Sequence, residues 1–366
     1  MPGSTAPNPP VLSKPVRVAL IGAGGIAGEH VNGFIRHADK IVCVAMADIA
    51  PENLRRRIDQ YGGPGVRAYA DWNRMLGDMG GDIDAVDICL PHHLHAPCIL
   101  SAVEAGKHVL CEKPMCNTLE EADRIASALR SRPGVVYMSA HNQLFLPSVR
   151  EARRLLDAGA IGRPFLVRSQ DCFHANWGPG GDPFGGTWRA SLRTQGGGVL
   201  IDTGYHPAYR LLHLAPRGSR VSAVRATMAR FRQRIEGEDS AAVVVRFDDG
   251  TLGEILTSWA FANPFGTHQV HVVGERGQLF GSGDTLYHLP AGAAEPEKMQ
   301  LAPVNTFEAQ VGHFADCLLT GARPPHGFTE ARAVLALILA ATRLAEGWQG
   351  ESPASTVHAA PAFQPR

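Results

Sequence analysis

A glycine-rich turn that joins an apolar strand pattern to a helical pattern is the feature that most constrains the fold of this chain. The turn reads GAGGIA at residues 22–27 and directly follows the apolar run Val16–Ile21. Gly22 allows a tight turn, Gly24 lets a pyrophosphate approach the backbone, and the small Ala27 lets a helix pack close to a sheet. The first turn of such a helix offers free N–H groups and a positive dipole end to phosphates. The pattern therefore predicts a dinucleotide site at Gly22, Gly24, Gly25 and Ile26.

A carboxylate at the end of the second apolar run indicates which dinucleotide binds. Asp48 directly follows the run Ile41–Ala47. A carboxylate at this place accepts hydrogen bonds from ribose hydroxyls and repels a 2′-phosphate. Ile49 follows, where an NADP site more often has a basic residue, and we expect Arg55–Arg57 to lie on the solvated face of the next helix. The sequence therefore favours NAD over NADP.

Short apolar runs alternate with amphipathic stretches from residue 16 to about 140. We expect strands at Val16–Ile21, Ile41–Ala47, Ala85–Leu90, Lys107–Leu110 and Val135–Ser139. We expect helices at Ile26–His37, Pro51–Tyr61, Asp71–Met79, His95–Ala105 and Leu119–Ser131. Thr118 and Glu121 have the spacing of a capping box at the start of the last helix. This alternation predicts an α/β fold with a parallel sheet covered on both faces.

The pattern changes after about residue 160. Longer β patterns are joined by turn signals at Asp249-Gly250 and Arg276-Gly277, and helical patterns at Thr306–Leu319 and Phe328–Glu346 close the chain. These runs predict an antiparallel sheet with one solvated or partner-covered face, and hence an α+β domain. We place a flexible tail at 1–14, the dinucleotide-binding domain at 15–140, the α+β domain at 141–350 and a loose tail at 351–366.

Composition and charge exclude several classes of protein. Hydrophobic residues make up 45% of the 366 residues and charged residues 19%, a globular balance. Thirty-five basic and 35 acidic residues cancel, which argues against a nucleic-acid or anionic-membrane partner. The longest strongly apolar run, Ala333–Thr342, has half the ~20 residues that span a bilayer, and the N-terminus has no signal-peptide pattern. Seven cysteines without a CxxC pair indicate reduced thiols, so we expect a cytoplasmic protein.

Two further motifs point to the second half of a site. Lys113 lies in Cys111-Glu112-Lys113-Pro114, at the carboxyl end of a predicted parallel strand, the edge at which such sheets bind ligands. An ammonium group there stabilises a developing alkoxide, although a lysine is more often a surface residue. Asp202 and His206 lie in DTGYH, a spacing that places a carboxylate and a histidine on one helical face. Pro207 either kinks that helix or lies in its first turn, and the pair can also be a helix cap and a core histidine.

These motifs together resemble those of the glucose–fructose oxidoreductase / inositol dehydrogenase (Gfo/Idh/MocA) family over nearly the whole chain. The shared segments are ALIGAGGIAGEH, ADIA, DICLPHHLHAP, CEKP, GAIGRP, GGG-x4-DTGYH and the β-rich second half, in this order. The resemblance implies a Rossmann domain followed by a domain with a large, mostly antiparallel sheet. It also implies NAD(P)-dependent oxidation or reduction of a sugar or cyclic polyol by a homodimer or homotetramer.

The resemblance also assigns roles to residues. Lys113 matches the active-site lysine, His206 the catalytic acid/base of many members, and Asp202 the neighbour that orients the substrate or the histidine. Further cofactor-binding residues would be Leu90, Pro91, His92, His95 and Glu112, together with Lys113. We expect the substrate to contact Asn142, Trp188, Arg189, Asp202 and His206.

Two departures from the family pattern concern the substrate. Many members have Asn-Arg-Arg-Phe-x-Pro where this chain has Asn142-Gln143-Leu144-Phe145-Leu146-Pro147, and the loss of both cations makes an acidic substrate less favourable there. Many members also have an aspartate three residues after the histidine, where this chain has Tyr209.

A long loop and a set of histidines leave alternatives open. The segment Asp171–Gly198 is rich in glycine and aromatic residues, and its Trp177, Trp188 and Arg189 either contact a sugar ring or pin the loop to the domain. A metal is suggested by several histidines, but their spacing gives no complete ligand set, so we predict no metal. These histidines are His92, His93, His95, His174 and His206.

The leading hypothesis is an NAD-dependent dehydrogenase or reductase. In it, His206 takes the hydroxyl proton, Lys113 stabilises the alkoxide and Asp202 orients the histidine. An NAD-dependent glycosidase, which oxidises its sugar only transiently, needs the same residues. A non-catalytic NAD-binding sensor would tolerate the loss of Lys113.

Overall fold

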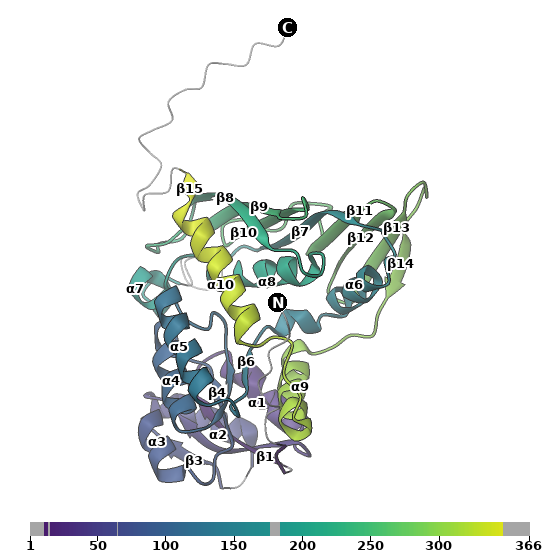
Figure 1. Ribbon diagram of the computed structural model, residues 1–366. Coiled ribbons are helices and arrows are strands. Elements are labelled where there is room, and N and C mark those ends of the chain that lie inside the picture. The colour runs from purple at the N-terminus through teal and green to yellow at the C-terminus, as the bar shows by residue number, and fades with distance from the viewer. Residues whose placement is uncertain (1–10, 14, 64, 176–183, 347–366) are drawn as a thin grey trace.

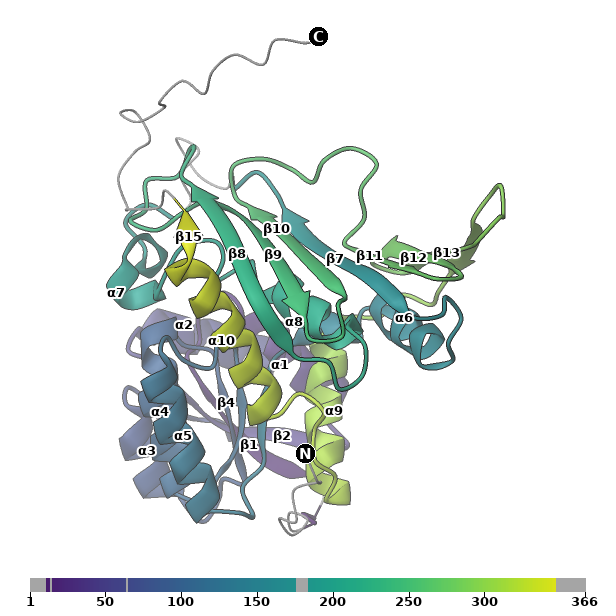
Figure 2. The same ribbon diagram turned by 45° about the horizontal axis from the view of Figure 1, so that its top comes forward.

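Two sheets organise the residues that the computed structural model describes, which are 11–13, 15–63, 65–175 and 184–346. The first sheet and its helices form one layered unit, and the second sheet lies beyond a group of helices that separates the two (Figure 1 and Figure 2). Trp177 of the predicted substrate loop, most of the predicted N-terminal tail and all of the predicted C-terminal tail lie outside the described residues.

The first sheet has six strands in the order β3-β2-β1-β4-β5-β6, and all of its pairs are parallel. The strands are β1 (Val16–Ile21), β2 (Ile41–Ala47), β3 (Arg67–Tyr69), β4 (Ala85–Ile88), β5 (His108–Cys111) and β6 (Tyr137–Ser139). The order reverses between β1 and β4, and this reversal opens a crevice at the carboxyl ends of the strands. The predicted Rossmann topology is confirmed.

Helices cover both faces of this sheet, as the alternating pattern predicts (Figure 1). Along β1, Ala19 and Ile21 pack into one apolar cluster, while Val18 and Leu20 pack into another on the opposite face. The helices are α1 (Ala27–Arg36), α2 (Pro51–Tyr61), α3 (Trp72–Met79), the 3₁₀ turn η1 (His92–Leu94), α4 (His95–Glu104) and α5 (Leu119–Ser131).

The predicted capping box at the start of α5 is confirmed. The Thr118 hydroxyl accepts the Glu121 N–H at 3.1 Å, and the Glu121 carboxylate accepts the Thr118 N–H at 3.2 Å. These two bonds satisfy backbone N–H groups that have no partner within the helix.

The second sheet has nine strands in the order β14-β13-β12-β11-β7-β10-β9-β8-β15. It is mostly antiparallel, as expected; only the β7–β10 and β8–β15 pairs are parallel. The strands are β7 (Pro164–Cys172), β8 (Val221–Ala229), β9 (Ser240–Phe247), β10 (Leu252–Ser258), β11 (Val270–Gly274), β12 (Gly277–Ser282), β13 (Thr285–Pro290), β14 (Glu297–Gln300) and β15 (Ala345–Glu346). Both predicted hairpin turns join neighbouring strands, β9 to β10 and β11 to β12.

Helices α6, α8 and α10 cover one face of the second sheet (Figure 2). The helical segments of this half are η2 (Asn142–Phe145), α6 (Pro147–Asp157), η3 (Trp188–Ala190), α7 (Leu192–Gln195), α8 (Tyr205–Leu214), α9 (Thr306–Thr320) and α10 (Phe328–Arg343). No helix in the described part of the chain is long and apolar enough to cross a bilayer.

Helix α9 follows the second sheet in the chain but packs on helix α1 of the first (Figure 1). A Cβ on Gly33 of α1 would lie 2.7 Å from the Val311 side chain, so this glycine permits the close contact. Leu12, inside the predicted flexible tail, donates its N–H to the Leu318 carbonyl at 3.0 Å. The two halves therefore share a common core around α1 and α9.

Candidate active site

A cavity of about 690 Å³ opens at the carboxyl edge of the first sheet and brings together residues from both halves of the chain. The first half contributes Gly22, Gly24, Gly25, Ile26, Asp48, Leu90, Pro91, His92, Glu112 and Lys113 to its lining. The second half contributes Asn142, Trp188, Arg189, His206 and Phe307. Most of the predicted site residues thus line a single cavity.

The glycine-rich turn forms one wall of this cavity. Gly22 has φ +88°, and a Cβ there would lie 2.4 Å from the Cys89 carbonyl oxygen. A Cβ on Gly24 or Gly25 would meet nothing within 4 Å, so the space above these two residues is open to a ligand. The turn therefore leaves room for a phosphate group at the N-terminus of α1.

Arg57 holds this turn from behind, and its predicted place on a solvated face is wrong. Its Nη2 donates to the Gly24 carbonyl at 2.7 Å and to the Gly25 carbonyl at 3.1 Å, and its Nε donates to Gly24 at 3.1 Å. The side chain is long enough to fold back from α2 over the turn, where the two carbonyls give its N–H groups partners.

Asp48 directly follows β2 and lines the cavity at the end of that strand. Its Oδ2 accepts the Ala23 N–H at 2.7 Å, and its Oδ1 accepts the Ala50 N–H at 2.8 Å. Each carboxylate oxygen retains a further lone pair. The carboxylate is thus fixed in position and can still accept the hydroxyls of a ribose.

Asp202 joins two cations at the opposite end of the cavity. The Lys113 ammonium donates to Asp202 Oδ1 at 2.7 Å and to its carbonyl at 3.0 Å, and Arg189 Nε donates to Oδ2 at 2.7 Å. Burial would raise the pKa of Asp202, but Lys113 and Arg189 hold it well below its usual value. Asp202 itself does not line the cavity and acts from behind these two side chains. Lys113 is 11% exposed and ion-paired, so it is not a surface lysine.

His206 lies in the first turn of α8, which begins at Tyr205 with Pro207 as its third residue. Of the two alternatives for Pro207, the helix start is therefore the one found. Asp202 precedes this helix, so the predicted placement of Asp202 and His206 on one helical face is wrong. Among the described residues, the hydrogen-bond partner of the His206 side chain is the Tyr209 hydroxyl, 2.6 Å from Nδ1, and not Asp202. Burial, with Lys113 and Arg210 nearby, holds the pKa of His206 well below its usual value.

The histidines after β4 differ in exposure to the cavity. His92 lines it, donates from Nδ1 to the Gln195 carbonyl at 2.8 Å and meets the Trp188 ring edge-on at 4.7 Å. His95 was expected to bind the cofactor, but it is fully buried and does not line the cavity. Its ring nitrogens lie 2.6 Å from the Pro114 carbonyl oxygen and 2.7 Å from that of Leu90. His95 thus fixes the backbone on which Leu90 and Lys113 are placed.

The predicted substrate loop reaches the cavity through Trp188 and Arg189. The Arg189 guanidinium lies over the Trp188 ring, 4.2 Å from its centroid. Since Arg189 also pairs with Asp202, these residues both pin the loop and present polar and aromatic groups to the cavity.

Comparison with known proteins identifies the family. A family model described as "Oxidoreductase family, NAD-binding Rossmann fold" matches residues 16–141, and the GFO/IDH/MocA C-terminal domain matches residues 149–280. The chain is 32% identical to 1,5-anhydro-D-fructose reductase of Ensifer adhaerens over 304 residues, which cover 81% of this chain and 86% of that enzyme. The chain belongs to the Gfo/Idh/MocA family of NAD-binding oxidoreductases.

Other members of the Gfo/Idh/MocA family match nearly the whole chain. Identity to scyllo-inositol 2-dehydrogenase (NAD(+)) of Bacillus subtilis is 27% over 343 residues, 89% of this chain and 93% of that enzyme. The structure of aldose-aldose oxidoreductase from Caulobacter crescentus has a TM-score of 0.78 at 26% identity and covers 91% of this chain and 98% of its own. Levoglucosan dehydrogenase in complex with NADH and levoglucosan has the same fold, with a TM-score of 0.79 at 23% identity over 91% of this chain and 97% of its own.

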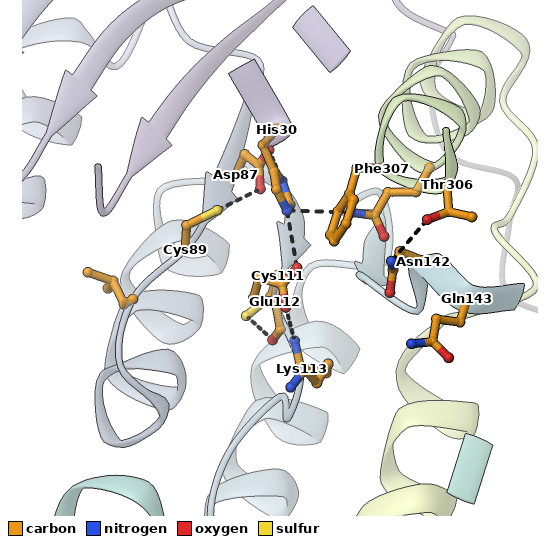
Figure 3. Close-up of polar contacts among 12 residues, drawn as sticks. His30, Asp87, Cys89, Cys111, Glu112, Lys113, Asn142, Gln143, Thr306 and Phe307 are labelled. Carbon is orange, nitrogen blue, oxygen red and sulfur yellow. Dashed lines mark hydrogen bonds and ion pairs between the residues drawn. The ribbon is translucent and has the colours of Figure 1, made fainter. Parts of the chain in front are cut away.

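Behind the cavity of this Gfo/Idh/MocA chain lies a buried histidine that the motifs do not indicate. His30 lies between two carboxylates, with Nδ1 2.8 Å from Asp87 Oδ2 and Nε2 3.1 Å from Glu112 Oε1 (Figure 3). Glu112 in turn accepts the Lys113 N–H at 3.2 Å. Burial opposes a charge on His30, but Asp87 raises its pKa well above the usual value. Its signal in the sequence is its position three residues after Ala27, on the buried face of α1.

His30, Asp87 and Cys89 place three ligand-type atoms within 4.8 Å of one another. These side chains already bond to one another. Asp87 Oδ2 lies 2.8 Å from His30 Nδ1, and Asp87 Oδ1 accepts the Cys89 thiol at 3.9 Å. They therefore form a closed polar cluster, and the absence of a metal from the active site stays a prediction.

Proposed function

We propose that the chain is an NAD-dependent oxidoreductase that transfers a hydride between a CH–OH carbon of a sugar, glycoside or cyclic polyol and the nicotinamide. One observation carries the proposal: Lys113 and His206, distant in sequence, line the same cavity as the glycine-rich turn and Asp48. The open space above Gly24 and Gly25 and the free lone pairs of Asp48 fit the phosphates and ribose of NAD.

The two candidate catalytic residues have complementary roles. NAD, when bound, supplies the hydride acceptor. Asp202 receives two N–H bonds from the Lys113 ammonium, so the third N–H is left to bond the substrate oxygen and stabilise its developing negative charge. His206, held neutral by its lowered pKa, accepts the hydroxyl proton. Asp202 therefore orients Lys113 and Arg189 rather than the histidine.

The substrate class is supported by the relatives. Their names include an anhydrofructose reductase, an inositol dehydrogenase and a levoglucosan dehydrogenase, which all act on ring-shaped polyhydroxy compounds. Trp188 at the cavity wall provides an apolar face for such a ring, and Asn142, Arg189 and His206 provide polar groups for its hydroxyls.

Lys113→Ala and His206→Ala test this assignment. We expect kcat for NADH formation from the best substrate of a polyol, hexose and glycoside panel to fall by about 10²–10⁴-fold in each variant, because each loses a group that acts on the reacting oxygen. NAD affinity, measured by protein fluorescence, should stay within a few-fold of wild type. Lys298→Ala, at an exposed site on β14, is the matched control.

Three outcomes separate the alternatives. Full activity in both variants would contradict the assignment of Lys113 and His206. Release of an aglycone without net NADH would indicate an NAD-dependent glycosidase. NAD binding without turnover of any compound would indicate a sensor.

We further propose a homodimer or homotetramer that covers the open face of the second sheet. This face exposes apolar side chains on two neighbouring strands, with Val244 of β9 at 53% and Leu252 of β10 at 47% exposure. Size-exclusion chromatography with light scattering measures the assembly, and Val244→Glu should shift it to the monomer.

All seven cysteines are free and buried, which supports a cytoplasmic location.

A further inference from the structure

A tyrosine one helical turn after His206 contacts its ring directly. The Tyr209 hydroxyl lies 2.6 Å from His206 Nδ1, and the two rings meet edge to face with centroids 5.5 Å apart. Only 2% of Tyr209 is exposed, so its hydroxyl is bonded by protein groups. The contact engages one of the two ring nitrogens of His206 and leaves Nε2 as the other.

The position of Tyr209 is fixed by groups outside α8. Its ring stacks on the His141 ring, with centroids 4.4 Å apart and an interplanar angle of 18°. The backbone N–H of Gln143 donates to its hydroxyl at 3.1 Å. Both contacts come from the segment between the two sheets, so the hydroxyl is in place before a substrate binds.

The protons around this hydroxyl can be assigned by counting donors and acceptors. A tyrosine hydroxyl donates one proton and accepts through two lone pairs. The Gln143 N–H takes one lone pair. If Nδ1 of His206 carries the ring proton, Nδ1–H donates to the second lone pair of the Tyr209 oxygen. The Tyr209 proton then points to Asn142 Oδ1 at 3.5 Å. In the opposite tautomer Tyr209 must donate to Nδ1, and Asn142 Oδ1 loses this donor.

We propose that Tyr209 is a positioning residue that keeps the ring proton of His206 on Nδ1, so that Nε2 is the acceptor of the substrate hydroxyl proton. The inference rests on the proposed function, since it takes His206 as the acid/base. In oxidation the substrate O–H bond breaks and its proton moves to Nε2, the adjacent C–H bond gives its electron pair and hydrogen to bound NAD as hydride, and a carbonyl group forms. The imidazolium then releases its proton to water. A hydroxyl partner is neutral, and therefore stabilises this imidazolium less than a carboxylate would.

Tyr209→Phe tests the proposal, with Tyr205→Phe as the matched control. Both variants remove one buried hydroxyl from α8, but Tyr205 donates to the Ala331 carbonyl at 3.0 Å and has no bond to His206. We expect kcat to fall about tenfold in Tyr209→Phe, the equivalent of one hydrogen bond, with an unchanged KM for NAD. Tyr205→Phe should keep the wild-type kcat and pH profile.

The tautomer can be measured without turnover. ¹⁵N NMR of the histidine rings should show His206 protonated at Nδ1 in the wild type and in Tyr205→Phe, and a shift toward Nε2–H in Tyr209→Phe; His206→Gln assigns the signal. Tyr209→Asp, a second variant, should move the acid limb of the kcat profile up by about one pH unit or more, because a carboxylate favours the imidazolium.

Two results would overturn the proposal: an Nε2–H tautomer in the wild type, or a Tyr209→Phe variant with wild-type tautomer and kcat. A wild-type protein that oxidises none of the compounds contradicts the proposed function instead, and the NMR result still decides the role of Tyr209.

Discussion

At the scale of single residues, the buried His30 side chain is the shared hydrogen-bond partner of two carboxylates. Asp87 and Glu112 each bond one of its ring nitrogens, and His30 itself is fully buried. His30→Phe keeps a ring of similar shape but leaves both carboxylates without this partner, and breaking a buried ion pair costs about 3–5 kcal/mol. We expect the free energy of unfolding in urea at pH 7 to fall by this amount.

His37→Ala is the control for this prediction, because His37 lies at the end of the same helix and is only half-buried. Its ring bonds a single group, the Glu308 carbonyl at 3.1 Å, so its loss should cost about 1 kcal/mol. Equal losses in the two variants would show that the carboxylates do not depend on His30.

Residues with a local motif could be placed from the sequence, and residues with distant partners could not. Gly22, Asp48 and Lys113 follow predicted strands, and the carboxyl edge of a parallel sheet fixes where they lie. Arg57 and His30 are different, since their partners lie 32 and 57 residues away in the chain. No spacing rule reports such a contact, and the pairing of His206 with Tyr209 rather than Asp202 depends on where α8 begins.

At the scale of elements, Glu238 supports the turn that leads into α8. Its Oε1 accepts the Leu200 N–H at 2.9 Å, and its own carbonyl accepts the Val199 N–H at 2.8 Å. Burial raises the pKa of Glu238 from 4.5 to about 7, although backbone N–H bonds at Leu200 oppose the shift. The folded protein therefore holds a proton between pH 4.5 and 7 that the unfolded chain has released, and stability falls as pH rises through this window.

Glu238→Gln should remove this pH dependence. The amide oxygen can still accept the Leu200 N–H and carries no charge. From pH 5 to pH 8 we expect the wild type to lose about 2.5 kcal/mol more stability than the variant, from the raised pKa. Urea unfolding of both proteins at these two pH values measures the difference, and parallel losses would mean that Glu238 does not titrate in this range.

Several long elements were predicted to within a few residues, whereas the eleven-residue helix α6 and the very short strands β3 and β15 were not predicted. β1, β2, α2 and α5 have the predicted bounds because each begins or ends at an apolar run, a proline or a cap. β3 and β15 have three and two residues, too few to show a period of two. They exist because neighbouring strands offer them backbone partners, which is a tertiary effect.

At the scale of the whole molecule, the rings of three histidines from separate elements gather around that of a fourth, His326. The rings of His141, His213 and His313 lie 6.2, 6.3 and 6.4 Å from that of His326, centroid to centroid. The four histidines come from the segment between β6 and η2, from α8, from α9 and from the segment before α10. The order of elements predicts both sheets, but it does not predict that these four side chains meet.

This histidine cluster should make the fold sensitive to acid. Burial lowers the pKa of His213 to about 4 and, with His213 and His313 nearby, that of His326 to about 3. Below pH 6.5 both histidines are protonated in the unfolded chain but stay neutral in the folded protein. Stability therefore falls as pH drops from 6.5 toward these values. When the pH is lowered from 7.5 to 5.5, each of the two histidines should reduce the free energy of unfolding by about 1.4 kcal/mol.

His326→Phe tests the origin of this loss. A phenylalanine can keep the edge-to-face contact with Phe145, which has centroids 5.8 Å apart, but it cannot take up a proton. Urea unfolding should therefore show about 1.4 kcal/mol less loss between pH 7.5 and 5.5 in the variant than in the wild type. An identical loss would place the acid sensitivity elsewhere in the molecule.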